Sequence, residues 1–328
     1  MDMVLGGTDS LGDRFGASHQ DGALLQLLEA LRERDYRFLT PTPASHARVM
    51  ARPERPVARS LHDVLGWSLA FAPGLLEPEL LGLLELAGAL ERADDGLLRS
   101  TLRVSSLMDD LYIHSAFPTD RDDAVFFGPD SYRFAALIEA ELGREKLRPH
   151  AHIVDIGTGA GVGAIVAAKH AGISAATGTD INPQALRLAA VNARAAGVAL
   201  QAVQGDDLGG VGRPIHLALA NPPYIIDDDE RQYRHGGAMH GGEVSLDMAR
   251  AAIERLAPGG RLILYTGSAI VRGEDALQAA LGETAQANAC TLRYRELDPD
   301  VFGEELASPA YRDVDRIALV AGVFTKGR

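Results

Sequence analysis

The sequence predicts an α/β protein with a doubly wound, mostly parallel sheet behind a mainly helical N-terminal region and a β-hairpin. From residue 152 to residue 267, short apolar runs alternate with helical stretches of 10–15 residues, as in successive βαβ units. Before them, leucines recur at helical spacing, and residues 102–115 alternate around Asp109 and Asp110 as a hairpin does. With 328 residues and 46% hydrophobic side chains, the chain can bury a sizeable core.

The first third of the chain contains three helical patterns and the hairpin. A stripe of leucines predicts the first helix, and four prolines between residues 41 and 56 exclude a long helix there. The elements expected in this part are helices over 21–34, 61–71 and 78–92 and the hairpin over 102–115.

The rest of the chain alternates between strands and helices. Gly172 and Pro183 fit the end of one helix and the first turn of the next. Strands are expected over 152–157, 174–181, 200–206, 214–224 and 261–267, with helices over 163–172, 183–197 and 245–260. Two further runs, 293–300 and 316–326, predict an antiparallel pair at one edge of the sheet.

The charge balance excludes some classes of protein. The 45 acidic and 32 basic residues leave a net charge of -13, which argues against sequence-blind binding to nucleic acid. One cysteine, Cys290, excludes an internal disulfide and a multi-cysteine zinc site, and we expect no metal site. The N-terminus does not resemble a secretory signal and no apolar run reaches 18 residues, so we expect a cytoplasmic protein without a membrane partner.

A glycine-rich loop follows the strand at 152–157. Residues 155–163 read Asp-Ile-Gly-Thr-Gly-Ala-Gly-Val-Gly, and the helix after them offers unpaired N–H groups to a ligand. The loop fits the dinucleotide pattern G-x-G-x-x-G/A and also the D-x-G-x-G-x-G pattern of S-adenosylmethionine (SAM) methyltransferases. Asp180 lies where both families place a carboxylate for the ribose hydroxyls. The loop therefore predicts a nucleoside cofactor and leaves open whether it is a dinucleotide or SAM.

A tetrapeptide at the end of the fourth strand favours SAM. Asn221-Pro222-Pro223-Tyr224, together with the glycine loop and Asp180, resembles the signature of class I SAM-dependent N-methyltransferases across residues 126–270. The resemblance implies a Rossmann-like sheet and methyl transfer to a planar nitrogen. In this chemistry the Asn221 side chain and the Pro222 carbonyl accept the two amine hydrogens, on a segment made rigid by Pro223, and Tyr224 stacks on the flat substrate.

The resemblance also assigns cofactor-binding residues. Either Asp206 or Asp207, after the third strand, matches the acid that meets the adenine amine. The residues matched to cofactor binding are Asp155, Gly157, Thr158, Gly159, Gly161, Asp180, Asn182, Asp206, Asp207 and Asn221.

Among families with this signature, the chain is most similar to the HemK-like glutamine N5-methyltransferases. They share the helical N-terminal domain, the hairpin, and a glycine-rich segment like residues 235–243. The resemblance implies a substrate-recognition domain over 1–125 and a SAM-binding catalytic domain over 126–328. The segment before the first strand departs from the family pattern, with Tyr132 or Arg133 expected near the cofactor carboxylate and a helix N-cap at Asp130 as the alternative.

Three functions follow from these observations. The first is transfer to an amide-type nitrogen of a protein, peptide or small metabolite, which the net charge favours. The second is transfer to a base amine in rRNA, tRNA or DNA, for which an arginine patch would be the footprint: Arg52, Arg55, Arg59, Arg99 and Arg103. The third is a protein that binds or uses SAM without methylating, which the complete polar signature disfavours.

Overall fold

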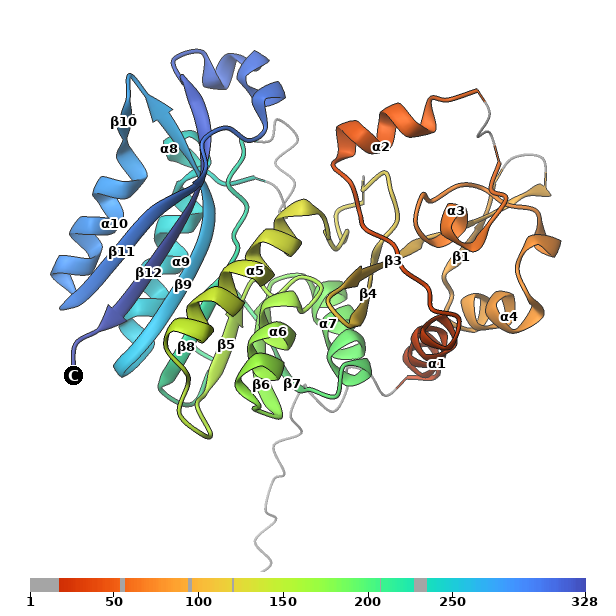
Figure 1. The fold of residues 1–328 in the computed structure, drawn as a ribbon, viewed down its shortest axis with the longest axis horizontal. Coiled ribbons are helices and arrows are strands. Elements are labelled where there is room, and N and C mark those ends of the chain that lie inside the picture. Colours follow the sequence, from red (N-terminus) through yellow and green to blue (C-terminus); the bar gives the residue numbers. More distant parts are fainter. Residues whose placement is uncertain (1–17, 54–56, 94–95, 120, 207, 227–234) are drawn as a thin grey trace, which may run out of the picture.

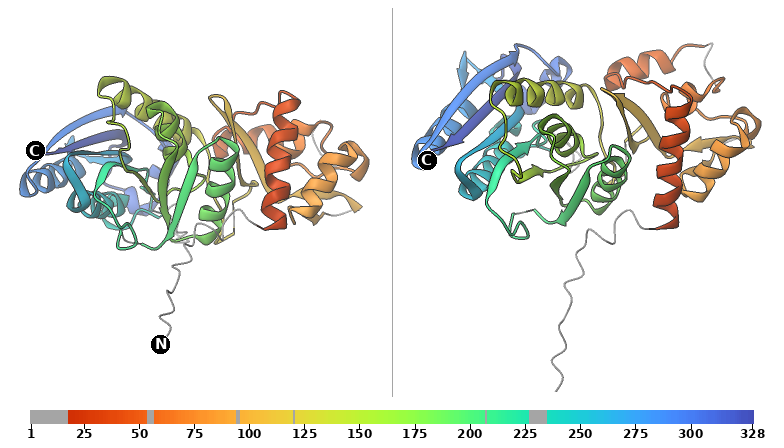
Figure 2. Two further views of the ribbon diagram at one scale, coloured as in Figure 1. Left: turned by 90° about the horizontal axis from the view of Figure 1, so that it is seen from below. Right: turned by 60° about the horizontal axis from the view of Figure 1, so that its bottom comes forward.

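The computed structural model describes residues 18–328 except 54–56, 94–95, 120, 207 and 227–234. A mainly helical N-terminal part stands beside a larger part built on an open sheet, and a β-hairpin lies between them (Figures 1 and 2). Within the described ranges, no helix combines the length and the apolarity needed to cross a membrane.

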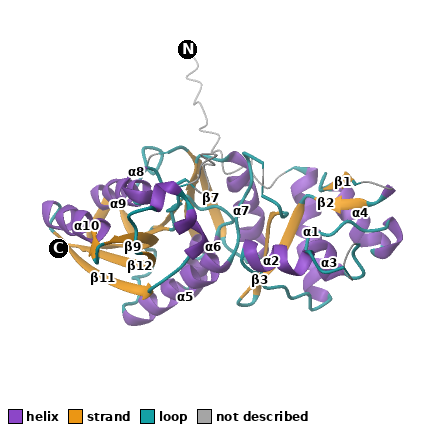
Figure 3. Cartoon of the chain, turned by 90° about the horizontal axis from the view of Figure 1, so that it is seen from above, coloured by secondary structure: helices purple, strands orange, loops and turns teal. Residues whose placement is uncertain are grey.

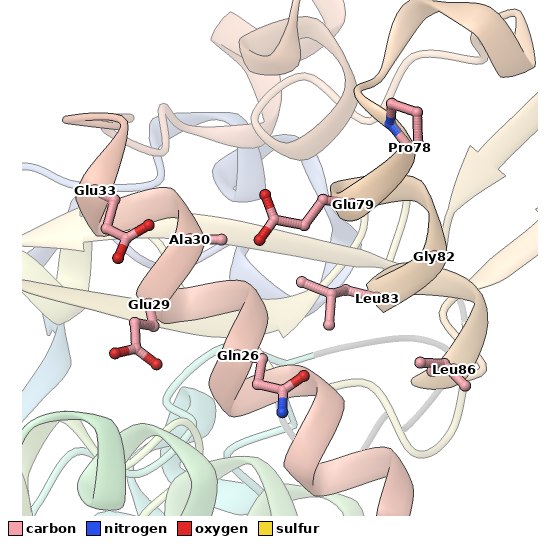
Figure 4. A pocket seen from close by; sticks show the side chains of 9 residues that line it. All are labelled: Gln26, Glu29, Ala30, Glu33, Pro78, Glu79, Gly82, Leu83 and Leu86. Carbon is pink, nitrogen blue, oxygen red and sulfur yellow. The ribbon is translucent and has the colours of Figure 1, made fainter.

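The N-terminal part contains four short helices and a small antiparallel pair. Its elements are α1 (His19–Glu33), α2 (Pro43–Met50), α3 (Leu61–Leu65), α4 (Pro78–Leu86), β1 (Leu90–Arg92) and β2 (Leu98–Ser100). The buried leucine stripe of α1 packs between α4 and the rest of the core. A groove of about 390 Å³ lies between α1 and α4, lined by the side chains of Figure 4, such as Glu29, Glu79 and Leu83.

Two of the expected N-terminal helices are shorter than predicted. The helix expected over 61–71 ends at Leu65, because Ser68 takes a positive φ of 58° and Phe71 pairs instead with Leu98 of β2. The helix expected over 78–92 ends at Leu86, and the chain turns at Gly88 into β1. Backbone pairing with β2 overrides the helical pattern at both places.

The predicted hairpin is confirmed. Strands β3 (Leu102–Leu107) and β4 (Asp110–Ser115) pair antiparallel from Leu102 opposite Ser115 to Leu107 opposite Asp110. The buried Asn192 of α7 (Pro183–Ala195) accepts from Ile113 N–H at 2.8 Å and donates to Ile113 C=O at 2.9 Å. The same amide donates to Ala160 C=O at 2.9 Å, so one side chain ties the hairpin to the glycine loop.

The central sheet has the predicted doubly wound order. Its strands are β5 (Ile153–Ile156), β6 (Ala175–Asp180), β7 (Ala199–Gln204), β8 (Ile215–Ala220), β9 (Leu256–Val271), β11 (Cys290–Asp298) and β12 (Arg316–Lys326). They lie in the order β11-β12-β9-β8-β5-β6-β7, with β9-β8-β5-β6-β7 parallel and β12 and β11 antiparallel. Short β10 (Glu274–Asp275) pairs with β9. The α/β prediction and the antiparallel edge pair are confirmed.

Helices cover both faces of the sheet (Figure 3). On one face of the sheet, Ile153 and Leu217 belong to an apolar cluster with α5 (Pro129–Arg144), α6 (Val162–Ala171) and α7. On the other it joins Val154 and Ala218 to α9 (Glu243–Arg255) and α10 (Ala276–Ala287), with α8 (Ala238–Gly241) before α9. Alternate strand residues therefore face opposite layers of one apolar core.

The structure corrects a further predicted boundary and adds helices that were not expected. The helix expected over 245–260 ends at Arg255, and β9 begins at Leu256 instead of residue 261. Pro258 has no N–H and pushes the residue before it toward an extended backbone, so the helix cannot continue. Helices α2, α5, α8 and α10 were not among the expected elements.

Candidate active site

The candidate site lies at the carboxyl ends of β5 and β8, which are neighbours in the sheet. Ile156 pairs with Ala220, so Gly157 and Asn221 directly follow paired residues. The chain moves from β5 to β6 and β7 on one side and returns to β8 and β9 on the other. Such a reversal of strand order opens a crevice at the carboxyl edge, which is where ligands bind in open α/β sheets.

The glycine loop after β5 leaves its backbone open to a ligand. Gly157, Gly159 and Gly161 have φ values of 65°, 53° and 87°, a region that favours glycine. A Cβ added at Gly159 would meet nothing within 4 Å, so the space beside this residue is free in the protein. The loop therefore fits a nucleoside cofactor that approaches the backbone closely.

Asp155 supports the loop from beneath. Its carboxylate Oδ2 accepts from Thr158 Oγ1 at 2.7 Å and from Ala164 N–H at 2.9 Å, and the residue is only 2% exposed. With its carboxylate buried under the loop, Asp155 positions the loop in this structure and does not present an oxygen to the crevice. Thr158, which donates one of these bonds, is also buried.

The buried Asp155 carboxyl predicts a pH dependence of stability. Burial raises its pKa from 3.8 to about 7, helped by the charge of Asp180 and opposed by the bonds from Thr158 and Ala164. Between these two values the native state keeps a proton that the unfolded chain has released. The stability that the protonated Asp155 contributes is therefore fully present below about pH 4 and is lost as the pH rises through about 7.

Urea unfolding of the wild type and of Asp155→Asn checks this dependence. Between about pH 5 and about pH 8, the wild type should lose roughly 3 kcal/mol more of its unfolding free energy than the variant, at about 1.4 kcal/mol per pKa unit. Asparagine keeps an acceptor oxygen for Thr158 and Ala164 but does not titrate. Parallel pH profiles for the two proteins would contradict the assignment.

Asp180 ends β6 and faces the glycine loop. Its Oδ2 accepts from Gly159 N–H at 2.9 Å and its Oδ1 from Asn182 N–H at 2.9 Å. Burial raises the pKa of Asp180, against backbone hydrogen bonds that lower it. Each carboxylate oxygen has a second lone pair, so the group can still accept from two ligand hydroxyls.

The other residues predicted at the cofactor site lie along the same edge. Asn182 caps α7 by accepting from Gln184 N–H, and its Nδ2 donates to Asp123 C=O at 3.1 Å. Asp206 is exposed just beyond the end of β7. Asp207 lies outside the described residues.

Asn221, Pro222 and Pro223 continue β8 into the crevice. No described residue hydrogen-bonds to the Asn221 side chain or to the Pro222 carbonyl, and Asn221 is partly exposed while Pro222 is buried. Pro223 is half-buried. An amide and a carbonyl without internal partners stand next to the glycine loop, available to a ligand.

Tyr224 has a different environment from the one expected. Its ring is 6% exposed, packs edge-on against Phe302 and lies against Gly267. Its hydroxyl donates to Asp130 Oδ2 at 3.0 Å, and burial together with Asp130 raises the pKa of the phenol. No ring face is open to stack on a flat substrate in this structure; the buried bond instead holds the end of the tetrapeptide in place.

Asp130 is the main site residue that the sequence analysis did not assign. It accepts from Tyr265 Oη at 2.7 Å as well as from Tyr224, and Arg133 lies 3.5 Å from it. The spacing of Phe134, Leu137, Ile138 and Leu142 at helical intervals could have revealed α5. The bond from Tyr265 of β9 spans 135 positions of the chain, and the bond from Tyr224 spans 94. No local sequence pattern reveals contacts over such separations.

The expected contact of Tyr132 or Arg133 with a cofactor carboxylate is not supported. Tyr132 Oη accepts from Thr40 N–H at 3.0 Å, and Arg133 pairs with Asp130 and with Asp298 at 3.7 Å. The alternative, a helix N-cap at Asp130, is wrong: α5 begins at Pro129 with Gly128 as its N-cap, and Asp130 lies in the first turn.

The glycine-rich segment supports the tetrapeptide from its other side. A Cβ at Gly241, whose φ is 94°, would lie 2.4 Å from the Tyr224 carbonyl oxygen. Gly236 N–H donates to Ile225 C=O at 2.7 Å, and Ile226 N–H donates to Tyr311 Oη at 2.7 Å. The backbones of the two segments therefore pack directly together.

Comparisons with known proteins agree with this geometry. Residues 139–294 match the family model of the methyltransferase small domain, which includes the glycine loop and the tetrapeptide. The chain is 35% identical over 165 residues to the release factor glutamine methyltransferase of Deinococcus radiodurans, covering 47% of this chain and 55% of that protein. It is 36% identical over 159 residues to the enzyme of the same name from Cereibacter sphaeroides, covering 44% and 56%. The chain thus spans about half the length of these relatives.

Among solved structures, the chain is similar to Trm5b from Pyrococcus abyssi, with 14% identity, a TM-score of 0.47 and coverage of 76% of this chain and 68% of that one. The family match and the strand order together support the predicted Rossmann-like methyltransferase sheet.

Proposed function

We propose that this protein is a SAM-dependent methyltransferase that acts on a planar, amide-type nitrogen. One observation carries the proposal: the partner-free amide of Asn221 stands directly beside the glycine loop, at the reversal of strand order. The methyltransferase small-domain match over 139–294 and the glutamine methyltransferase relatives support the same reaction class.

The residues at the edge of the sheet fit SAM. The open space at Gly159 accepts the methionine part, Asp180 has lone pairs free for the ribose hydroxyls, and exposed Asp206 lies beyond β7 for the adenine amine. When bound, SAM supplies a methyl group on a positively charged sulfonium.

The protein's contribution is to hold and orient the acceptor nitrogen. An amide nitrogen is a poor nucleophile because its lone pair is delocalised, so its orientation decides the rate. The Asn221 side-chain oxygen and the Pro222 carbonyl oxygen accept its two hydrogens and direct the lone pair toward the methyl group. They also stabilise the positive charge that develops on the nitrogen. Tyr224, tied to Asp130, holds this segment in position.

A protein or peptide glutamine is the acceptor that we favour. The two relatives are named for methylation of a glutamine in a release factor, and a side-chain amide presents the NH₂ that two acceptors can grip. We assign recognition of the acceptor to residues 1–125 and catalysis to residues 126–328. Support for this division comes from the hairpin and from Asn192, which connect the N-terminal part to the glycine loop.

The structure does not favour a nucleic-acid base as the acceptor. Of the arginines expected to form a basic patch, Arg103 is only 4% exposed and Arg99 is half-buried, whereas Arg52 and Arg59 are exposed. Arg55 lies outside the described residues. Buried arginines do not contribute to a surface that neutralises phosphates.

Transfer of radiolabelled methyl groups from SAM into a fractionated lysate tests the proposal. We expect label in protein or peptide at glutamine, and labelling slower by roughly a hundredfold or more when Asn221→Ala replaces the wild type. Label in RNA or DNA would show that the acceptor is a nucleic-acid base and not an amide. An absence of both SAM binding and labelling would overturn the proposal.

A further inference from the structure

A second, small pocket lies in the N-terminal part, away from the glycine loop. Helix α2, the hairpin and the segment before α5 enclose it. Its volume is about 20 Å³, enough for roughly one water molecule. Its walls include His46, Arg103, His114, Phe117, Phe126 and Phe127.

Two buried nitrogens in these walls have no hydrogen-bond partner. They are Nη2 of Arg103 and Nδ1 of His46, and the two residues are 4% and 2% exposed. Arg103 uses only Nε, which donates to Gly66 C=O at 2.8 Å, and its guanidinium lies over the Phe38 ring at 5.5 Å. Buried donors without partners are rare in folded proteins, and those of a charged group are especially costly.

The surroundings of Arg103 contain no compensating acid. Among the described residues, no carboxylate lines the pocket or pairs with the guanidinium, and the groups that act on its charge are the phenols of Tyr36 and Tyr132. Burial lowers the pKa of Arg103 to about 10, so the side chain still carries its charge at neutral pH. His114 and His46 cannot neutralise it, because an imidazole is either neutral or positive, and burial lowers the pKa of both rings and so keeps them uncharged. Within the part of the chain that the structure describes, the positive charge of the pocket therefore lacks a counter-ion.

We infer that this pocket binds a carboxylate of a ligand, with one oxygen held against the Arg103 guanidinium that lines it. Arginine presents a planar fork that matches a carboxylate, and charge-assisted bonds of this kind are strong where water is excluded. The space admits one carboxylate oxygen while the rest of the ligand lies in the opening between aromatic side chains.

The position of the pocket connects it to the candidate active site. Thr40, in the pocket wall, donates through its N–H to Tyr132 Oη on the first turn of α5. The same turn carries Asp130, which accepts from Tyr224. Resting on the proposed function, the inference is that the methyl acceptor carries a carboxylate in addition to its reactive amide, as an acidic peptide does.

Binding of potassium acetate to the ¹⁵N-labelled protein tests the pocket by itself. The Arg103 Nε–Hε resonance should shift and saturate with acetate, whereas potassium chloride at equal ionic strength should leave it in place. In Arg103→Met, acetate affinity should fall at least about tenfold, the loss of one charge-assisted bond. Arg99→Met, which removes an arginine outside the pocket walls, is the matched control and should bind acetate like the wild type.

The His46 imidazole provides a readout that needs no variant. Acetate should raise the pKa of His46 from about 4 in the wild type, because a nearby anion favours the charged ring. A pocket that holds only a structural water would show neither the shift nor saturation, and equal effects of chloride and acetate would also overturn the inference.

Calorimetry with SAM on the same samples separates the two proposals. SAM binding and methyl transfer without acetate binding would overturn the pocket alone. Acetate binding in a protein that neither binds SAM nor transfers a methyl group would overturn the proposed function alone.

Discussion

Asn221→Ala is expected to lower methyl transfer by roughly a hundredfold to a thousandfold, the range found when one preorganised polar group is removed from a transition state. Alanine removes the oxygen that orients the acceptor nitrogen. Since no described residue hydrogen-bonds to the Asn221 side chain, its removal leaves no internal group unpaired. The fold and SAM affinity should therefore stay within a few fold, which calorimetry checks beside the turnover assay.

Two further variants sharpen this prediction. Asn221→Asp keeps an acceptor oxygen at the same place and should restore part of the activity. Asn288→Ala makes the same chemical change at the end of α10, where the amide donates to Thr284 C=O, and should leave turnover unchanged. Near-wild-type transfer by Asn221→Ala would show that the amide does not hold the acceptor.

Asp180→Ala should weaken SAM binding by roughly 1.5–3 kcal/mol, about ten- to 150-fold in Kd. The substitution removes the proposed acceptor for the ribose hydroxyls. It also releases Gly159 N–H and Asn182 N–H, so the glycine loop and the start of α7 lose a common anchor. Calorimetric titration with SAM measures the effect.

The control for Asp180 must separate charge from position. Asp247→Ala removes an equal charge from the exposed surface of α9, where it pairs with Arg250, and should not change the Kd. Asp180→Asn keeps one acceptor oxygen and should fall between the wild type and Asp180→Ala. An unchanged Kd in Asp180→Ala would remove this residue from the cofactor site.

Local patterns accounted for most of the fold. Apolar runs ending at glycine or proline predicted β5, β6, β7 and β8, and the alternation at residues 102–115 predicted the hairpin. The errors occurred where a distant partner outweighed the local preference. Phe71 left a helical pattern to pair with Leu98, and residues 256–260 joined β9 rather than extending α9.

The candidate site divides in the same way. Residue types and spacing identified the glycine loop, Asp180 and the tetrapeptide, because close approach to a ligand requires glycine, and gripping an amine requires acceptors without internal partners. The roles within the site required the tertiary structure. Burial turned Asp155 inward beneath the loop and turned the Tyr224 ring away from solvent, onto Asp130.

The amino-acid sequence by itself determined the βαβ order, the positions of the loop and the tetrapeptide at strand ends, and the acidic balance of the chain. These depend on periodicity and on residue chemistry, which act over a few neighbouring positions. Only the tertiary structure decided that α5 brings Asp130 to Tyr224 and that Arg103 is buried with no acid against it among the described residues. Such contacts join residues far apart in the chain, and whether a charge is satisfied depends on everything that packs around it.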